Sequence, residues 1–349
     1  MPDPLRCAVV GAGTMGSLYA AAFAQLPDAE LTKIVDLDEE RAAAVAVEHP
    51  NSTTLSSVEA LLDAGDVDAV AVALPDFAHR ETVNALLEAG IHVLCEKPLA
   101  TTREDCQAMA AAERASSASL MVNYGNRHKP AARVLRERIR GGELGAVQSI
   151  IFKGHEQLTK TLTLKWRDRT SPTWFLISHI VDMVEWLTGE KLVSVFGLGA
   201  PGSPEVLGAT GGPNTVTYLG ELEGGGHATM SSSWILPKGF TRGGDFSVEV
   251  IGESGVATVD FTELGAHYYG TTASEPGWDF DTPDFDGKLS GWWFTSCRYF
   301  VDCAISGRRP EPDSIEGLRV SAVLAAMTES IETGARVGVP DWAAGVADA

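Results

Sequence analysis

The stretch LRCAVVGAGTMG, residues 5–16, decides the fold of this chain. A short apolar run leads into three glycines, and a helical pattern follows over about residues 14–25. In this spacing the first glycine permits a tight turn, the second lets a pyrophosphate approach the backbone, and the third lets the helix pack closely on the strand. The N–H groups at the start of the helix then face the phosphates. The residues expected at this dinucleotide site are Gly11, Gly13, Thr14, Met15 and Gly16.

Asp36 ends the next expected strand, twenty residues after Gly16 (36 − 16). An acidic side chain at this place accepts hydrogen bonds from the ribose hydroxyls of the adenosine half of a dinucleotide. It would repel the 2′-phosphate of NADP, and the next residues, Leu37 and Asp38, supply no arginine. The sequence therefore predicts NAD as the cofactor, with a glycine turn that binds no ligand as the alternative.

Apolar strands alternate with helical patterns as far as residue 124. Later strands are expected at 31–35, 68–74, 91–95 and 119–123. This alternation is typical of a parallel sheet with both faces covered. After about residue 125, longer strands separated by glycine clusters predict an open, largely antiparallel sheet. We therefore expect an α/β protein with a doubly wound Rossmann domain over residues 1–124 and an α+β domain for substrate binding and oligomerisation over residues 125–349.

Two strand ends of the first half carry candidate site residues. Glu96 and Lys97 follow the strand at 91–95, and ligands of open α/β sheets bind beyond such strand ends. Lys97 suits a donor to a substrate oxygen and to the nicotinamide ribose; an ordinary surface lysine is the alternative. The strand at 68–74 ends in the same way, and the residues expected near the cofactor there are Leu74, Pro75 and His79. For His79, a helix start that faces solvent is an equal alternative.

A lone histidine, His179, lies in the apolar stretch TSPTWFLISHIVDMVEW, residues 170–186. Ser171 suits a helix cap and Pro172 the first helical position. The residues alone leave two interpretations open: a histidine packed in the core, or a proton-transfer group aimed at a substrate.

Composition narrows the class of protein. The net charge of −20 disfavours nucleic acids and anionic membrane surfaces as partners. The five cysteines form no C-x-x-C pair, so no thiolate metal site is expected, and no other metal site is predicted. The N-terminus does not read as a signal peptide, and no apolar run reaches the length of a membrane helix. We therefore expect a cytoplasmic protein.

These motifs together resemble the Gfo/Idh/MocA oxidoreductases, which include inositol and glucose dehydrogenases. The resemblance rests on GAGTMG (11–16), ALPDFAHRETVNALLEAGIHVLCEKPLATT (73–102), NYGNRHKPAARVLRERIRGGELGAVQSI (123–150), SHIVDMVEWLTG (178–189) and IEGLRVSAVLAAMTESIETGARVGV (315–339). It implies NAD(P)-dependent hydride transfer between nicotinamide and the carbinol or ketone of a sugar, polyol or sugar derivative. It also implies that Lys97 and His179 are the catalytic pair.

The chain departs from the family pattern at the entry to the histidine helix. Phe175 stands where an aspartate is usual, one turn before His179. Asp182, on the same helix side, and Asp168, on the preceding loop, are candidates for a replacement carboxylate. The residues expected to contact substrate are Lys97, Tyr124, Trp166, Arg167, Phe175 and His179.

Two other functions stay open. One is an enzyme that retains NAD and cleaves a glycosidic bond by oxidation and elimination, and the other is a non-catalytic NAD-binding sensor. For any of these functions, the strands of the second half would leave a broad sheet face. Because monomers rarely expose large apolar patches, we expect a homodimer or homotetramer built through that sheet.

Overall fold

The computed structural model describes residues 3–202, 207–240, 244–262, 284–285 and 288–346. The chain divides into two compact units, each described here by itself. The first unit holds Met1–Gly125, Thr282–Ser321 and Trp342–Ala349, and the second holds Asn126–Asp281 and Ala322–Asp341. No helix within the described ranges is both long enough and apolar enough to cross a membrane.

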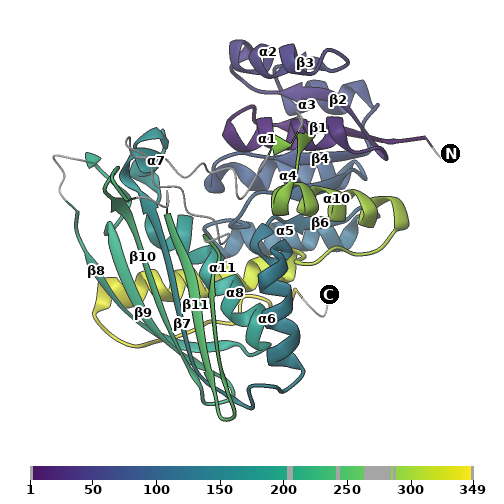
Figure 1. Cartoon of the computed structure of the whole chain (residues 1–349). Helices are drawn as coiled ribbons and strands as arrows, with labels where there is room; N and C mark the ends of the chain where they lie inside the picture. Colours follow the sequence, from purple (N-terminus) through teal and green to yellow (C-terminus); the bar gives the residue numbers. More distant parts are fainter. Residues whose placement is uncertain (1–2, 203–206, 241–243, 263–283, 286–287, 347–349) are drawn as a thin grey trace. The chain divides into compact units, whose positions relative to one another are not determined.

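The first unit is built on a six-stranded parallel sheet in the order β3-β2-β1-β4-β5-β6 (Figure 1). Its strands are β1 (Leu5–Val10), β2 (Ala29–Val35), β3 (Thr53–Leu55), β4 (Ala69–Val72), β5 (His92–Cys95) and β6 (Leu120–Val122). Its helices are α1 (Thr14–Gln25), α2 (Glu39–Glu48), α3 (Val58–Ala64), α4 (His79–Glu88) and α5 (Arg103–Ala115). The strand order reverses between β1 and β4, and in such sheets ligands bind at the reversal, beyond the strand ends. The predicted Rossmann architecture is confirmed.

A late helix completes the core of the first unit. Helix α10 (Gly291–Ser306) follows the short pair β13 (Asp284–Phe285) and β14 (Lys288–Leu289). Its residues Cys297, Phe300 and Val301 are buried in one cluster with Tyr19 and Phe23 of α1. The sequence predicts one domain over residues 125–349, whereas residues 282–321 and 342–349 belong to the first compact unit, and α10 packs on α1 there.

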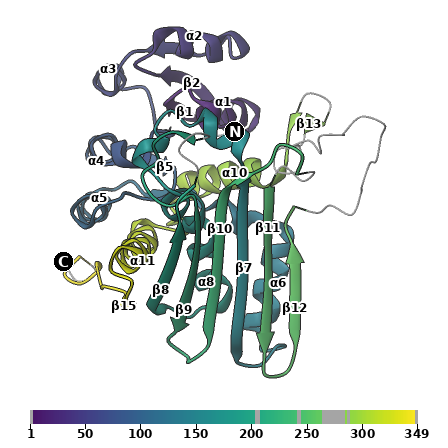
Figure 2. The same ribbon diagram turned by 90° about the vertical axis from the view of Figure 1, so that its left-hand side faces the viewer.

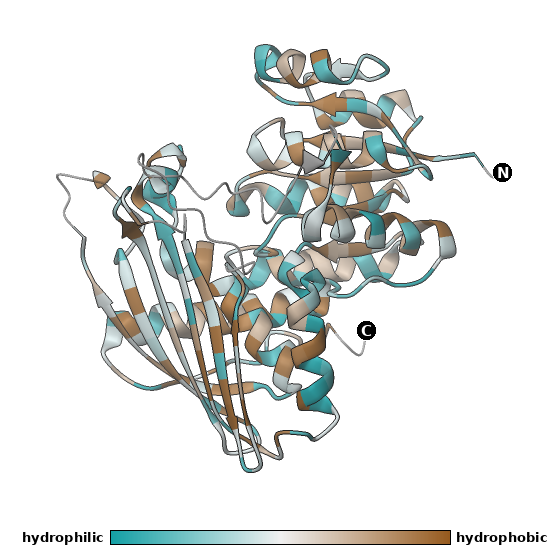
Figure 3. Ribbon diagram, in the orientation of Figure 1, coloured by the Kyte–Doolittle hydropathy of each residue, from teal (hydrophilic) through white to brown (hydrophobic). Residues whose placement is uncertain are grey.

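The second unit is built on a seven-stranded mixed sheet in the order β12-β11-β7-β10-β9-β8-β15. The strands are β7 (Val147–Gln157), β8 (Leu192–Ala200), β9 (Thr215–Leu222), β10 (His227–Leu236), β11 (Gly244–Gly252), β12 (Val256–Asp260) and β15 (Val337–Gly338). Only β7 and β10 pair in parallel among the pairings described, so the sheet is largely antiparallel, as predicted. Residues along these strands alternate in hydropathy, as expected for a sheet buried on one face (Figure 3).

Helices cover one face of this sheet. Figure 2 shows α6 (Pro130–Arg140) and α8 (Ser178–Thr188) behind the strands. The described residues also form the short α7 (Leu158–Thr163) and the long α11 (Ser314–Thr333), and the two units divide within α11. Ile150 and Phe152 of β7 and Ile180 and Met183 of α8 are fully buried in this layer. On the opposite face, Leu198 of β8 and Leu219 of β9 are 66% and 53% exposed.

Candidate active site

The glycine turn after β1 has the shape that a pyrophosphate needs. Gly11 has a φ of 96°, and a Cβ on it would lie 2.4 Å from the carbonyl oxygen of Ala73. A Cβ on Gly16 would lie 1.7 Å from the carbonyl oxygen of Gly11, so helix and turn pack without room for a side chain. A Cβ on Gly13 would meet nothing within 4 Å, which leaves the backbone open to a ligand. Gly13 is the N-cap of α1 and has no side chain to bind the first N–H groups of the helix. These N–H groups are therefore suited to bind phosphate oxygens.

The Asp36 carboxylate is held next to this turn by two backbone N–H groups. Its Oδ2 accepts a hydrogen bond of 2.8 Å from the backbone N–H of Ala12, and its Oδ1 accepts one of 2.9 Å from the N–H of Asp38. The carboxylate therefore joins the glycine turn to the start of α2, at the place where a Rossmann fold holds the adenosine ribose. The residues present fit an NAD molecule at the turn.

Arg41 is a residue of this region that the sequence reasoning missed. Its Nη1 lies 3.4 Å from Asp36 Oδ2, and its Nη2 lies 2.9 Å from Asp38 Oδ2. No arginine stands at the two positions after Asp36, but the first turn of α2 brings the Arg41 side chain back beside the Asp36 carboxylate. Asp38 is the N-cap of α2 and accepts from the N–H of Arg41. That capping pattern was the signal available in the sequence.

His79 is a fully buried histidine that joins two loops. Its Nε2 lies 3.0 Å from the carbonyl oxygen of Leu74, after β4, and its Nδ1 lies 3.1 and 3.0 Å from those of Pro98 and Leu99, after β5. The alternative of a solvent-facing histidine is wrong. The Leu74 side chain in turn lies beside Gly11. His79 therefore joins the loop beside the glycine turn to the loop that follows β5.

Lys97 is half-buried directly after β5, and its backbone is held by Glu96. The buried Glu96 carboxylate accepts a hydrogen bond of 3.1 Å from the Lys97 N–H through Oε2, and its Oε1 accepts from the hydroxyl of Tyr19. The peptide bond to Pro98 is cis. Glu96 thus fixes the backbone of Lys97 at the strand end.

The support behind Glu96 continues through buried polar groups. Asn123 donates through Nδ2 to the Tyr19 hydroxyl at 2.5 Å, and Ser296 of α10 donates to Asn123 Oδ1 at 2.7 Å. Burial raises the pKa of Tyr19 well above its usual value, and the Glu96 charge adds to the effect. Tyr19 therefore keeps its proton and remains a donor to Glu96. Tyr124, next in the chain after Asn123, is almost fully buried beyond β6.

The first unit thus brings its predicted residues to the carboxyl ends of the strands. These residues are Gly11, Gly13, Thr14, Met15, Gly16, Asp36, Leu74, Pro75, His79, Glu96, Lys97 and Tyr124. This edge is where the fold binds dinucleotides.

His179 is a half-buried residue in the first turn of α8, in the second unit. A π-helical segment, Thr173–Ile177, leads directly into α8, and the carbonyl oxygen of Ser171 accepts a hydrogen bond of 2.8 Å from the Phe175 N–H. The Thr173 hydroxyl is bound to the Tyr218 hydroxyl of β9 at 2.7 Å, which fixes the wider turn against the sheet. Such π-helical turns occur often at functional sites.

Phe175 packs on an aromatic side chain of the sheet. Its ring centroid lies 6.5 Å from that of Trp234, which is fully buried and donates from Nε1 to Asn214 Oδ1 at 2.5 Å. Phe175 therefore packs against apolar side chains at the position where the family usually has an aspartate.

The two carboxylates proposed as replacements have different surroundings. Asp182 forms a buried ion pair with Arg127, whose Nη2 lies 2.6 Å from Asp182 Oδ1 and whose Nε lies 3.1 Å from both carboxylate oxygens. This pair fixes α8 to the segment that precedes α6. Asp168 is exposed to solvent.

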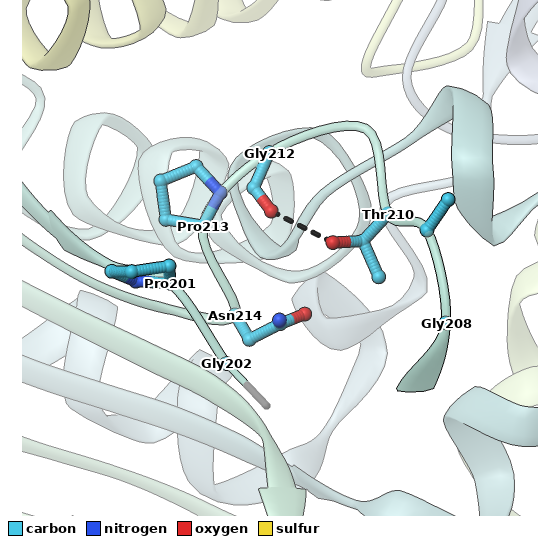
Figure 4. A pocket seen from close by; sticks show the side chains of 8 residues that line it. Pro201, Gly202, Gly208, Thr210, Gly212, Pro213 and Asn214 are labelled. Atoms are coloured by element: carbon cyan, nitrogen blue, oxygen red, sulfur yellow. Dashed lines mark hydrogen bonds between the residues drawn. The ribbon is translucent and has the colours of Figure 1, made fainter. Parts of the chain in front are cut away.

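Arg167 holds a neighbouring loop. It donates from Nε to the carbonyl oxygen of Leu207 at 3.0 Å and from Nη1 to that of Leu164 at 3.3 Å, while its own carbonyl accepts from Gly211. Trp166 is half-buried beside it. Figure 4 shows an open hollow of about 430 Å³ nearby, lined by Pro201, Gly202, Gly208, Ala209, Thr210, Gly212, Pro213 and Asn214. None of these lining residues is titratable, so the hollow carries no acid–base group of its own.

Comparison with family models assigns the chain. Residues 5–124 match the oxidoreductase family model described as an NAD-binding Rossmann fold, and residues 136–339 match the C-terminal alpha/beta domain model of the same family. The chain belongs to the Gfo/Idh/MocA oxidoreductase family.

Several Gfo/Idh/MocA proteins are similar over nearly the whole chain. A myo-inositol dehydrogenase, Hyg17, of Streptomyces leeuwenhoekii is 34% identical over 308 residues, covering 87% of this chain and 89% of the relative. The solved structure of a putative myo-inositol dehydrogenase from Sinorhizobium meliloti 1021 has a TM-score of 0.81 at 22% identity and covers 96% of this chain and 100% of that one. The structure of GenD2 from gentamicin A biosynthesis, in complex with NAD, has a TM-score of 0.84 at 24% identity and covers 97% of both chains. The predicted resemblance and the oxidoreductase class are confirmed.

Among the residues described, no cluster of three or more histidine, cysteine, aspartate or glutamate side chains suits a metal ion.

Proposed function

We propose that this Gfo/Idh/MocA oxidoreductase transfers hydride between NAD and a secondary alcohol or ketone carbon of a cyclic polyol or sugar of the inositol type. The observation that carries the proposal is Lys97 at the end of β5, whose backbone N–H is held by the Glu96 carboxylate, on the same sheet edge as the glycine turn. The myo-inositol dehydrogenase from Streptomyces leeuwenhoekii, at 34% identity, supports the substrate class.

The residues have separate tasks in this proposal. NAD supplies the hydride acceptor when it is bound. The glycine turn holds its pyrophosphate and Asp36 accepts from its ribose hydroxyls. Lys97 donates a hydrogen bond to the reacting oxygen of the substrate, and His179 takes the hydroxyl proton as the carbonyl forms. In reduction the same residues act in the opposite direction.

The second unit supplies further contacts in the proposal. Trp166 and Phe175 offer apolar contact to the ring face of a sugar or polyol, a surface that aromatic side chains bind well. Arg167, which donates to two carbonyl oxygens, shapes the loop beside them. We propose this unit as the substrate-binding part and the first unit as the NAD-binding part.

A substrate screen tests the proposal. Purified protein is incubated with NAD and with inositols, other polyols, sugars and sugar acids, and the absorbance band of reduced nicotinamide is followed. At least one cyclic polyol or sugar is expected to give net NADH. Cleavage of a glycoside with no net NADH would favour the NAD-retaining mechanism instead. NAD binding without turnover of any compound would favour the sensor.

We further propose a cytoplasmic homo-oligomer. The five cysteines are free and buried, as expected in a reducing compartment. Phe196, Leu219 and Ile151 fall in one row across the exposed sheet face, with Thr229 between the last two. Such a row suits a second copy of the chain, so light scattering at micromolar concentration is expected to give a dimer or tetramer. A monomer would contradict this part of the proposal.

A further inference from the structure

The adenosine-ribose end of the glycine-turn site carries a cation as well as its carboxylate. Arg41 Nη1 lies 3.4 Å from Asp36 Oδ2, and Arg41 Nη2 lies 2.9 Å from Asp38 Oδ2. The two carboxylates exceed the single guanidinium by one negative charge (−2 + 1).

Asp36 and Arg41 differ in exposure and in how firmly they are held. Asp36 is only 9% exposed and is fixed by the N–H groups of Ala12 and Asp38. Arg41 is 39% exposed, and the contacts described for its guanidinium are these two carboxylates. Because Arg41 Nη1 already lies 3.4 Å from Asp36 Oδ2, a group bound at Asp36 lies next to the guanidinium, and Arg41 has more freedom to rotate than Asp36.

NAD and NADP differ at this point of the dinucleotide. NADP carries a 2′-phosphate, which an aspartate repels and which an arginine binds through charge-assisted hydrogen bonds. One ion pair therefore contains both the carboxylate that selects NAD, Asp36, and a guanidinium suited to NADP, Arg41.

We propose that Arg41 is a specificity-determining residue for the cofactor. While Asp36 is present, Asp36 and Asp38 hold the guanidinium, and their excess negative charge disfavours the 2′-phosphate. Without the Asp36 carboxylate, the same guanidinium binds the 2′-phosphate, so one substitution turns the preference toward NADP. This inference rests on the proposed binding of a dinucleotide at the glycine turn.

Calorimetric titration of the full chain with NAD⁺ and with NADP⁺, at low salt, tests the inference without any need for turnover. Asp36→Ser keeps a short oxygen acceptor for the Ala12 N–H and removes the charge. This variant is expected to bind NADP at least about tenfold more tightly than the unaltered chain does, with weaker NAD binding. Asp36→Ser combined with Arg41→Ala is expected to lose that gain. Higher salt is expected to reduce the gain because it screens the new ion pair.

Arg80 provides a matched control. It also lies in the first turn of a helix of the first unit and pairs with an aspartate, Asp105, at 2.9 Å. Asp36→Ser combined with Arg80→Ala is therefore expected to keep the full gain in NADP affinity.

Two results would overturn the inference: no gain in Asp36→Ser, or an equal gain when Arg41 is also removed. If Asp36→Ser does not fold, Asp38→Asn provides the test, because it keeps a cap for α2 and releases one partner of the guanidinium. It is expected to raise NADP affinity several-fold, and an unchanged affinity overturns the inference. Tight NAD binding with no Arg41-dependent gain would overturn this inference alone, whereas no dinucleotide binding to the unaltered chain would overturn the proposed function as well.

Discussion

The buried Arg127–Asp182 ion pair leads to a prediction about how α8 is held. Arg127 and Asp182 have side chains that are only 8% and 1% exposed, and Asp182 follows His179 on α8 by three residues. Asp182→Leu leaves the Arg127 guanidinium buried without its carboxylate. Removal of one partner of such a buried pair costs about 3–5 kcal/mol. At roughly 2–4 °C for each kcal/mol in a domain of this size, the melting temperature of the second unit is expected to fall by roughly 6–20 °C.

A double-mutant cycle separates the pair from its surroundings. Arg127→Met combined with Asp182→Leu removes both charges, so it is expected to be clearly more stable than either single variant. Glu143→Gln is the matched control, because its pair with Arg138 is 57% and 58% exposed and is worth less than about 1 kcal/mol. Thermal unfolding followed by circular dichroism gives the stabilities. Single variants as stable as the Glu143→Gln control, or a double variant that loses the sum of both single effects, would refute the reasoning.

Two further predictions concern the second unit. Phe175→Asp places a carboxylate in the layer that Phe175 forms with Trp234, so it is expected to lower the free energy of unfolding by about 1–3 kcal/mol. The control Phe175→Leu is expected to cost less. Equal melting temperatures of the two variants would show that this position is not part of an apolar layer. Burial lowers the pKa of His128 to about 4, and the charges of Arg133 and Arg127 add to the effect. A histidine with a lowered pKa in the folded state stabilises the fold above its unfolded pKa of about 6.5, and this contribution is lost as the pH falls toward 4. Urea unfolding at pH 7 and pH 5 is expected to show a smaller pH dependence in His128→Gln; an unchanged dependence would exclude His128 as its source.

Much of the first unit could be predicted from the sequence, because its signals are local. The three glycines, the strand before them and Asp36 lie close together in the chain, and each is required by the geometry of one turn. The Ala12–Asp36 hydrogen bond and the open space at Gly13 are what this pattern predicts. The same holds for Lys97, because the end of an apolar strand is visible in the sequence.

The contacts that could not be predicted from the sequence join segments that lie far apart in the chain. The helical spacing makes Asp182 a candidate partner for His179, but its carboxylate pairs with Arg127, 55 residues earlier in the chain. The burial of His79 depends on carbonyl oxygens that follow a different strand. Helix α10 packs with α1 because of an apolar face that no local pattern assigns to the first unit. Arg41 follows Asp36 by five residues (41 − 36), and only the first turn of α2 brings its guanidinium back to that carboxylate.

The central claim is that Lys97 and His179 serve NAD-dependent oxidation of a polyol or sugar alcohol. The most direct measurement is the turnover of NAD with the best substrate of the screen by the unaltered chain, Lys97→Ala and His179→Ala, together with calorimetric NAD affinity for each. Each substitution is expected to lower turnover by at least about 10²-fold, the scale of losing a positioned acid–base group, while NAD affinity stays nearly unchanged. Unchanged turnover in either variant, or a loss of turnover explained entirely by lost NAD binding or a lower melting temperature, would contradict the account.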